Sequence, residues 1–435
     1  MQLYPRREET IAGIAKAIRD RRRTCVDVVE GCLKQIDEWE PKVHAWVSLD
    51  REGALAAARD LDRELQDGRV RGPLHGIPLG IKDLVDVKGW PTAAGAPWLA
   101  NAVAAADAPI VARLRAAGAI ILGKTVTTQF ACFDPPITRN PWNLERTPGG
   151  SSSGSAAAVA TGMCLGAIGS QTGGSITRPA SFCGIAGCKP SFGLVPTQGV
   201  YPLSGSMDHP GPLARTVEDL ALMLSVIVDP ADRDRFTAIP PIETVRLGRL
   251  RGMFADRADP PALAVFEKSL DQLARAGAKV SEVALPAAFD DVLRSHRVIM
   301  TTELAAHHRE MLPAHYAEYR PGIRSLIEEG LRVDQAEYER CKAHQQALKD
   351  EIAAAFRDVD ALACPAARGP APTTETTGDP AFNAPWSYTG LPTVSFPIGL
   401  STQGLPLAIQ LVGRLDDEAK LFGAAAWCER NVSPV

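Results

Sequence analysis

The sequence predicts an α/β protein with one large β-sheet. From about residue 73 onwards, short apolar runs of strand character alternate with segments of helical periodicity, the pattern of a sheet covered by helices. The chain has 435 residues, of which 45% are hydrophobic, so it can bury a large core. No Pro-, Gly- or Ser-rich linker separates two halves, and the sequence contains no internal repeat. We therefore expect a single domain over residues 1–435.

The N-terminal part, residues 1–70, is predicted to be helical. Apolar residues recur there at helical spacing in "IAGIAKAI", "CVDVVEGCLKQI" and "GALAAARDLDREL". The segment "IPLGIKDLV" that follows is predicted to form a buried strand and a turn. Next, "APIVARLRAAG" is predicted to be a helix that ends at Gly118, and "AIIL" a short buried strand.

The second half of the chain continues the alternation. "TVEDLALMLSVIV" is predicted to be a helix, and a strand–helix–strand unit follows in "VRLGRL", "PALAVFEKSLDQLARAG" and "KVSEVAL". Residues 288–360 are charged and helical, and we expect them to form a helical elaboration within the domain. The C-terminal part is predicted to contain the strands "ALACPA", "LPTVSFPIGL" and "LPLAIQLVGR" and a last helix from about residue 416.

Composition excludes several classes of function. The net charge of −4 gives no electrostatic case for a nucleic-acid partner. The N-terminal "MQLYPRREET" lacks the apolar core of a signal peptide, and the longest low-charge run, residues 147–176, is interrupted by glycines and serines. We therefore expect a soluble, cytoplasmic protein with no membrane partner.

The cysteines and histidines do not form a metal-binding pattern. The nine cysteines are scattered, and Cys183 and Cys188 have no matching Cys or His pair downstream. The eight histidines include no HExxH pattern. We expect reduced, mostly buried thiols, no metal and no cofactor.

"GAIILGKT", Gly118 to Thr125, matches the phosphate-loop pattern G-x-x-x-x-G-K-[ST] by letter only. That motif needs a flexible loop followed by a helix, whereas Ala-Ile-Ile-Leu is strand material and "TVTTQF" is a poor helix start. Lys124 is therefore interpreted as a surface or structural lysine at the end of a strand.

Two turns rich in glycine and serine carry the strongest chemical signal. The first, "GGSSSGSAAAVA" at 149–160, combines a linker-like composition with an apolar continuation that should be buried. In the second, "GSQTGGSITRPASFCG", Ser175 directly follows Gly173 and Gly174. Glycines before a serine let the backbone turn tightly and direct N–H groups to one point, as an oxyanion hole requires.

A lysine is the third element of this pattern. Lys82 lies in the apolar run "GPLHGIPLGIKDLVD", where apolar surroundings disfavour the ammonium form and favour a neutral base near pH 7. His75 and His209 are the alternative bases. No G-x-S-x-G elbow accompanies them, so a serine–histidine pair is the weaker hypothesis.

Together and in this order, these motifs resemble those of the amidase signature enzymes. The similar segments are "LHGIPLGIKD" at 74–83, "RNPWNLERTPGGSSSGSAAAVA" at 139–160, "TGGS" followed by "RPASFCGIAGCKPS", "SMDHPGPLARTVEDLALML" at 206–224 and "GLPLAIQLVG" at 404–413. The resemblance extends over the chain and implies a single large mixed β-sheet flanked by helices.

The resemblance also implies roles for individual residues. Ser175 matches the acylated nucleophile, Ser151 the bridging serine and Lys82 the base of a Ser–Ser–Lys triad. The backbone N–H groups of Thr172, Gly173, Gly174 and Ser175 would form the oxyanion hole. A cis peptide bond is expected between Gly150 and Ser151.

The sequence departs from the usual family pattern near the site. Gln171 stands where Asp is usual, and Thr177, followed by Arg178, stands where Arg is usual. The segment after "GKT" reads Val-Thr-Thr-Gln-Phe instead of Asn, two variable residues, Glu and Phe. In the family the acyl pocket is lined just after this point. The candidates for the substrate pocket are therefore Phe130, Ala131 and Cys132, with Phe133 beside them.

These observations predict an amide hydrolase that works through an acyl-enzyme. The uncharged pocket candidates favour apolar or aryl amides, and carbamates (urethanes) suit the same chemistry. Two alternatives within the family are the glutaminase subunit of a tRNA-dependent amidotransferase and a hydrolase of urea-type amides; a non-catalytic binding protein on the same fold is a third. The expected partner is a small-molecule amide, and a homodimer is the assembly considered.

Overall fold

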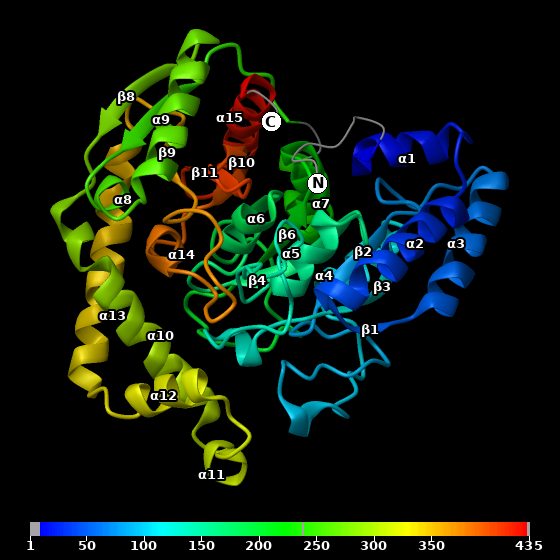
Figure 1. The fold of residues 1–435 in the computed structure, drawn as a ribbon, viewed down its shortest axis with the longest axis horizontal. Coiled ribbons are helices and arrows are strands. Elements are labelled where there is room, and N and C mark those ends of the chain that lie inside the picture. Colours follow the sequence, from blue (N-terminus) through cyan, green and yellow to red (C-terminus); the bar gives the residue numbers. More distant parts are fainter. Residues whose placement is uncertain (1–8, 237–238, 433–435) are drawn as a thin grey trace.

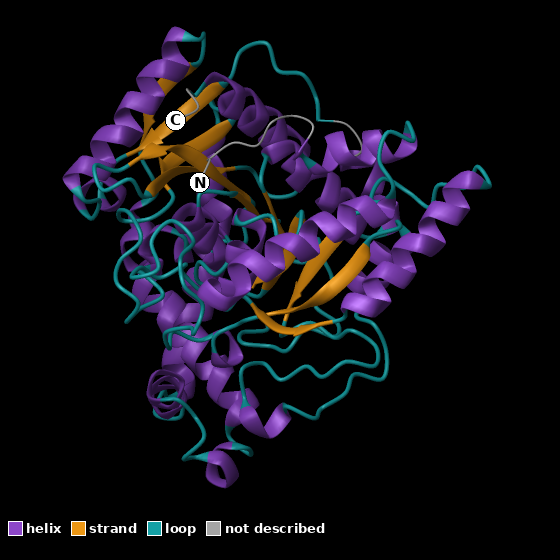
Figure 2. Ribbon diagram, turned by 45° about the vertical axis from the view of Figure 1, so that its right-hand side comes forward, coloured by secondary structure: helices purple, strands orange, loops and turns teal. Residues whose placement is uncertain are grey.

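One mixed sheet forms the centre of the computed structural model, which describes residues 9–236 and 239–432. In these residues eleven strands form a single sheet in the order β1-β3-β2-β4-β6-β5-β10-β11-β9-β7-β8, and helices pack along it (Figures 1 and 2). This confirms the predicted fold class. The strands are β1 (Trp46–Leu49), β2 (Pro78–Lys82), β3 (Ile120–Thr125), β4 (Gly166–Gln171), β5 (Ala186–Lys189), β6 (His209–Ala214), β7 (Arg246–Leu250), β8 (Lys279–Val283), β9 (Ala361–Pro365), β10 (Thr393–Leu400) and β11 (Pro406–Val412).

The sheet contains two parallel regions joined by antiparallel strands. Strand β2 runs parallel to β3 and β4, and β7 runs parallel to β8 and β9. The other pairings are antiparallel, including the long pair β10–β11. Parallel strands in one sheet require crossover connections, which here carry helices such as α4 (Pro109–Ala116), α5 (Ser153–Ala160) and α9 (Pro260–Arg275).

The N-terminal segment contains three helices and one edge strand. The helices are α1 (Ile11–Arg19), α2 (Cys25–Val43) and α3 (Arg51–Gln66). Thr10 and Thr24 cap the first two by accepting hydrogen bonds from Gly13 N and Asp27 N. Helical periodicity did not predict β1, which pairs antiparallel with β3; four residues are too few for a period to show.

Two short helices lie at the centre of the molecule and directly follow the two serine-containing turns. They are α5 and α6 (Thr177–Cys183), which contact each other and the sheet (Figure 1). Helix α5 is made of Ser, Gly, Ala and Val, so its backbone approaches its neighbours closely: a Cβ on Gly154 would lie 2.1 Å from the carbonyl oxygen of Ala45. This explains why a serine- and glycine-rich stretch continues into small apolar residues.

The remaining helices cover the sheet or extend from it. Helix α7 (Val217–Ile227) packs on β5 and β6, and α15 (Glu418–Asn431) packs on α7 and β10; α8 (Met253–Asp256) precedes α9. Residues 288–360 contain α10 (Val292–His308), α11 (Leu312–His315), α12 (Pro321–Gly330) and α13 (Gln335–Glu351). Helix α10 packs on α12, α13 and α14 (Ala384–Tyr388), and α11 and α12 project at the bottom of Figure 1.

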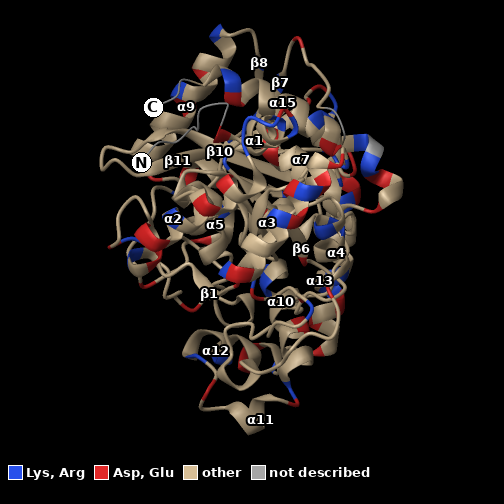
Figure 3. Ribbon diagram, turned by 90° about the vertical axis from the view of Figure 1, so that its right-hand side faces the viewer, with Lys and Arg blue, Asp and Glu red and all other residues tan. Residues whose placement is uncertain are grey.

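The surface carries charges of both signs. Figure 3 shows basic and acidic residues interspersed on the outer helices of one face. Many form exposed ion pairs, such as Arg297–Glu329. No helix within residues 9–236 and 239–432 is long and apolar enough to cross a membrane.

Of the two interpretations of Lys124, a surface or a structural lysine at the end of a strand, the structure supports the structural one. Residues Ile120–Thr125 form strand β3 and no phosphate loop, and Lys124 is buried in that strand. Its Nζ lies 2.9 Å from Asp83 Oδ1 and donates to the Pro91 carbonyl and to Thr92 Oγ1. The lysine is therefore half of a buried ion pair.

Candidate active site

Lys82 is the last residue of β2, between β3 and β4, and it is completely buried. Its Nζ lies 2.7 Å from Ser151 Oγ and 2.9 Å from Ser170 Oγ. The carbonyl oxygen of Ser170 lies 3.4 Å away. The structure thus brings together Lys82 and Ser151, two residues that are 69 positions apart in the sequence.

The electrostatic surroundings of Lys82 favour a neutral amine. Burial lowers its pKa to about 7, and the negative charge of Asp208 opposes this lowering. An exposed lysine has a pKa near 10.4 and is almost wholly charged at neutral pH. Lys82 is therefore placed to gain and lose a proton near pH 7.

Ser151 lies in the loop that leads into α5. Gly149 has φ +82°, and the peptide bond between Gly150 and Ser151 is cis, as expected. The Gly150 carbonyl accepts a hydrogen bond from Arg178 Nη2 at 2.8 Å, and the Gly149 carbonyl accepts one from Ser153 Oγ at 2.8 Å. These contacts hold both peptide units that precede Ser151.

Ser175 lies in the turn between β4 and α6. It is 7% exposed, and its carbonyl oxygen accepts a hydrogen bond from Ser152 N at 3.3 Å. This bond links the two serine-containing turns that the sequence analysis identified. The Ser175 turn directly follows β4 and leads into α6, and the loop that carries Ser151 leads into α5. Helix α5 contacts both β4 and α6, which fixes the relative position of the two turns.

Several side chains hold the turn 172–174 from outside. Thr172 Oγ1 donates to Asp208 Oδ1, and His296 Nε2, on α10, donates to the Thr172 carbonyl at 3.0 Å. The backbone N–H groups of residues 172–175 donate to no acceptor among the residues that the structure describes. They are therefore available to an oxygen bound in this turn.

Gln171 replaces the usual carboxylate with a neutral amide that supports the same turn. Its Oε1 accepts hydrogen bonds from Ile176 N at 2.9 Å, Thr177 N at 3.0 Å and Thr177 Oγ1 at 3.1 Å. The two departures from the family pattern, Gln171 and Thr177, are thus bonded to each other.

The three pocket candidates adjoin an aromatic cluster. Phe130 and Cys132 are buried and Ala131 is half-buried; Phe130 and Ala131 have φ of 47° and 61°. The Phe130 ring packs against four rings whose centroids lie 4.5–5.8 Å away, those of His308, Tyr201, Trp98 and Tyr319. Phe130 is therefore enclosed by this aromatic cluster, and Ala131 is the most exposed of the three candidates.

The two candidate histidine bases bond to backbone. Nδ1 of His75 accepts from Arg71 N at 3.2 Å, and its Nε2 lies 3.1 Å from the Leu61 carbonyl oxygen. His209 Nδ1 lies 2.6 Å from the Met207 carbonyl oxygen. Burial lowers the pKa of both rings. These contacts hold loops and favour Lys82 as the base.

Sequence reasoning did not identify Ser170, Asp208 or His296. The first lies within a quoted motif, and Asp208 lies in "SMDHPG", but neither has a spacing that marks its role. His296 comes from the helical elaboration, more than 120 residues from Thr172. Only the fold shows that these three residues contact the site.

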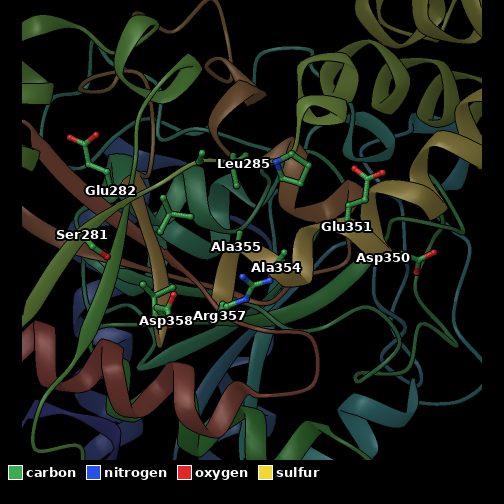
Figure 4. A pocket seen from close by; sticks show the side chains of 13 residues that line it. Ser281, Glu282, Leu285, Asp350, Glu351, Ala354, Ala355, Arg357 and Asp358 are labelled. Carbon is green, nitrogen blue, oxygen red and sulfur yellow. The ribbon is translucent and has the colours of Figure 1, made fainter.

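A groove elsewhere on the molecule has a volume of about 910 Å³. Figure 4 shows it between β8 and the end of α13 with the segment that follows, and Glu282, Asp350, Glu351, Arg357 and Asp358 lie around it. None of its lining residues belongs to the turns that carry Ser151 and Ser175. The groove is therefore separate from the candidate active site.

Comparisons with known proteins agree with the motifs. The family model described as Amidase matches residues 27–422. A glutamyl-tRNA(Gln) amidotransferase subunit of Cyanothece sp. is 34% identical over 469 residues, which cover 96% of each chain. The native peptide amidase from Stenotrophomonas maltophilia has a similar structure, with a TM-score of 0.84, 31% identity and coverage of 98% and 97% of the two chains. A structure described as a vestigial complex that reveals the origins of an s-triazine catabolic enzyme has a TM-score of 0.90, at 30% identity and coverage of 98% and 99%.

Proposed function

The chain belongs to the amidase signature family, and on that premise we propose that it cleaves linear amides through an acyl-enzyme on Ser175. Lys82 acts as the base and Ser151 carries the proton between them. The observation that supports this most strongly is the buried contact of 2.7 Å between Lys82 Nζ and Ser151 Oγ. A serine hydroxyl is a weak nucleophile without such a base.

In the acylation step, Ser175 Oγ attacks the amide carbonyl carbon. Its proton passes to Ser151 Oγ, while the Ser151 proton passes to neutral Lys82. A hydroxyl can donate and accept at once, which suits Ser151 to this exchange. The carbonyl oxygen becomes an oxyanion, and the backbone N–H groups of residues 172–175 stabilise it.

Breakdown of the tetrahedral intermediate reverses the proton path. The C–N bond breaks, and a proton returns from Lys82 through Ser151 to the leaving nitrogen, which departs as an amine. Water then attacks the acyl ester and gives its proton to the same relay. Release of the carboxylic acid restores the Ser175 hydroxyl.

We place apolar and aryl acyl groups, and carbamates, first among the substrates. The aromatic cluster around Phe130 supports this proposal, because aromatic rings pack favourably against apolar and aryl groups. Asp134 is the acidic residue nearest to the pocket candidates along the chain. Its two carboxylate oxygens already accept hydrogen bonds from Gly322 N and Ile323 N, so they are engaged within the protein. Phe130, Ala131 and Cys132 remain the proposed pocket residues.

A glutaminase within a larger complex is the second candidate, favoured by the 34% identity to a glutamyl-tRNA(Gln) amidotransferase chain. Such a protein would cleave glutamine and work with protein partners. The segment after "GKT" departs from the family pattern, which supports the first candidate. Turnover of glutamine alone, or stable co-purification with a partner chain, would favour the glutaminase.

The test is product release from a mixed panel by wild type and Ser175→Ala. The panel holds short aliphatic amides, aryl anilides, glutamine, a urea-type amide and an aryl carbamate. Ser225→Ala in α7 is the matched control, since Ser225 is similarly buried but distant along the chain. We expect turnover of anilides or carbamates by wild type and the control, and its loss in Ser175→Ala. Full activity of a folded Ser175→Ala variant would contradict the mechanism.

A further inference from the structure

Lys82 has a second serine beside it that the proposed mechanism leaves without a role. Ser170 Oγ lies 2.9 Å from Lys82 Nζ, and the Ser170 carbonyl oxygen lies 3.4 Å from it. We propose that Ser170 is a positioning residue that orients the Lys82 amine so that its lone pair faces Ser151. This inference rests on the proposed function.

The argument follows from the bonding capacity of an amine. Neutral Lys82 has two N–H groups and one lone pair in a tetrahedral arrangement, and three oxygens surround it: Ser151 Oγ, Ser170 Oγ and Ser170 O. If both N–H groups donate to Ser170, the lone pair remains for the Ser151 hydroxyl. After proton transfer the ammonium has three N–H groups and the same three acceptors. Both protonation states therefore suit one side-chain position.

The fold holds Ser170 independently of Lys82. The parallel ladder between β2 and β4 ends at Ile81 and Ile168, so the backbone of Ser170 lies just beyond it. There Ser152 Oγ accepts from Ser170 N at 3.3 Å and lies 3.3 Å from the Ser170 carbonyl oxygen. Ser170 is thus a fixed support at the end of a central strand. This also gives Ser152 a structural task.

The charged groups near Lys82 do not provide this orientation. Asp208 acts on Lys82 by its charge but bonds to Thr172 and to the backbone N–H groups of Leu203 and Ser204. Asp83, the next residue along the chain, is paired with Lys124. Among the described residues, serine oxygens are the hydrogen-bond partners of Lys82 Nζ.

The experiment compares Ser170→Ala and Ser170→Thr with wild type and Ser225→Ala. The main readout is the rate of covalent labelling by an alkyl fluorophosphonate between pH 5 and 9, which needs no knowledge of the substrate. We expect Ser170→Ala to be labelled about 10-fold or more slowly, a part of the 10²–10⁴ that positioned proton transfer contributes. With the best panel substrate, kcat should fall by a similar factor and KM should change little.

The pH profile separates positioning from a merely structural role. Removing the Ser170 hydroxyl removes an acceptor that stabilises the ammonium form of Lys82, so the Lys82 pKa should fall further. The acidic limb of the profile, which is the pH range in which the labelling rate falls as Lys82 becomes protonated, should therefore move down by about one pH unit. Ser170→Thr keeps a hydroxyl on a residue suited to a strand. This variant should be labelled at nearly the wild-type rate, and its acidic limb should lie at the wild-type pH. Thermal unfolding of each variant reports on the fold.

Two results distinguish the failure of this inference from the failure of the proposed function. Suppose that Ser175→Ala is inert, but that folded Ser170→Ala has the labelling rate of wild type and an acidic limb at the same pH. Then only the role of Ser170 is wrong. If wild type is not labelled, or Ser175→Ala is still labelled and active, the proposed function is wrong and the role of Ser170 with it. The positioning role would also be overturned if Ser170→Ala had a lower unfolding temperature while the acidic limb of its labelling profile stayed at the wild-type pH.

Discussion

Two lysines on neighbouring strands show how the hydrogen-bond and ion-pair partners of a side chain determine its role. Lys82 on β2 and Lys124 on β3 are both buried, and burial lowers the pKa of each. Lys124 bonds to the Asp83 carboxylate, which stabilises its charge. Lys82 bonds only to serine oxygens among the described residues, so it can lose its proton near pH 7. One is suited to structure and the other to proton transfer.

The pKa of Lys82 predicts how activity depends on pH. The base must be neutral, so kcat/KM should be constant well above pH 7 and fall about tenfold per pH unit well below it. Lys82→Arg should be inactive at every pH, because a guanidinium stays charged. Initial rates from pH 5 to 9 with the best panel substrate measure both. A wild-type rate that is flat down to pH 5 would show that Lys82 is not the base.

The Asp83–Lys124 pair predicts an effect on stability. Asp83→Asn should lower the free energy of unfolding by about 3–5 kcal/mol, because it leaves a buried ammonium without a counter-charge. Glu329→Gln is the matched control: it removes one partner of the exposed pair with Arg297 and should cost about 1 kcal/mol or less. Denaturant unfolding at pH 7.5 compares them. Equal losses of unfolding free energy in the two variants would show that the buried pair contributes no more to stability than the exposed one.

At the scale of elements, the segment after β3 is attached to the helical elaboration at two points. Gln129 Nε2 donates to the Glu318 carbonyl at 3.1 Å, and its Oε1 accepts from Arg320 N at 2.7 Å. Asp134 accepts from the first turn of α12. At its other end, Thr128 N donates to the Ser151 carbonyl at 3.4 Å. The proposed pocket residues thus lie between Ser151 and the projecting helices.

Gln129 provides the test of this attachment. Gln129→Glu restores the usual family residue and removes the donor to Glu318 while burying a carboxylate. We expect a loss of about 1–3 kcal/mol in unfolding free energy and a rise in KM that is larger for aryl than for small aliphatic substrates. Gln346→Glu, an exposed change on α13, is the control. Unchanged KM values in a folded Gln129→Glu variant would show that the attachment does not shape the pocket.

At the scale of the whole molecule, burial protects the thiols. All nine cysteines are free and buried, which confirms the expectation of reduced, mostly buried thiols. Burial raises the pKa of Cys32 and of Cys364 to about 12, so few thiolates exist at neutral pH. An aromatic disulfide reagent should therefore react slowly with the native protein and quickly with nine thiols after denaturation in guanidinium. A fast-reacting thiol in the native state would reveal an opening near that cysteine.

The elements that the sequence predicted well are those with a strong local pattern. The amphipathic helix α9, the apolar strands β10 and β11 and the strand β3 all lie where the sequence analysis expected them. Edge strand β1 was missed because a strand of four residues has no distinct period and takes its conformation from β3. For Lys124 the sequence left a surface and a structural interpretation open, because its partner, Asp83, is brought to it only by the pairing of β2 with β3.

The sequence by itself determined the family, the fold class and the positions of Lys82, Ser151 and Ser175 in distinctive motifs. Such motifs can be recognised in the sequence alone, because each turn needs its glycines and serines at fixed local spacing. Only the tertiary structure decided what surrounds them. The contacts of Ser170 with Lys82, of Asp208 and His296 with Thr172, and of Gln129 with residues 318–320 join segments 36 to 191 residues apart. No local pattern encodes such contacts, because they depend on the order in which the strands pair and on where the helical elaboration packs.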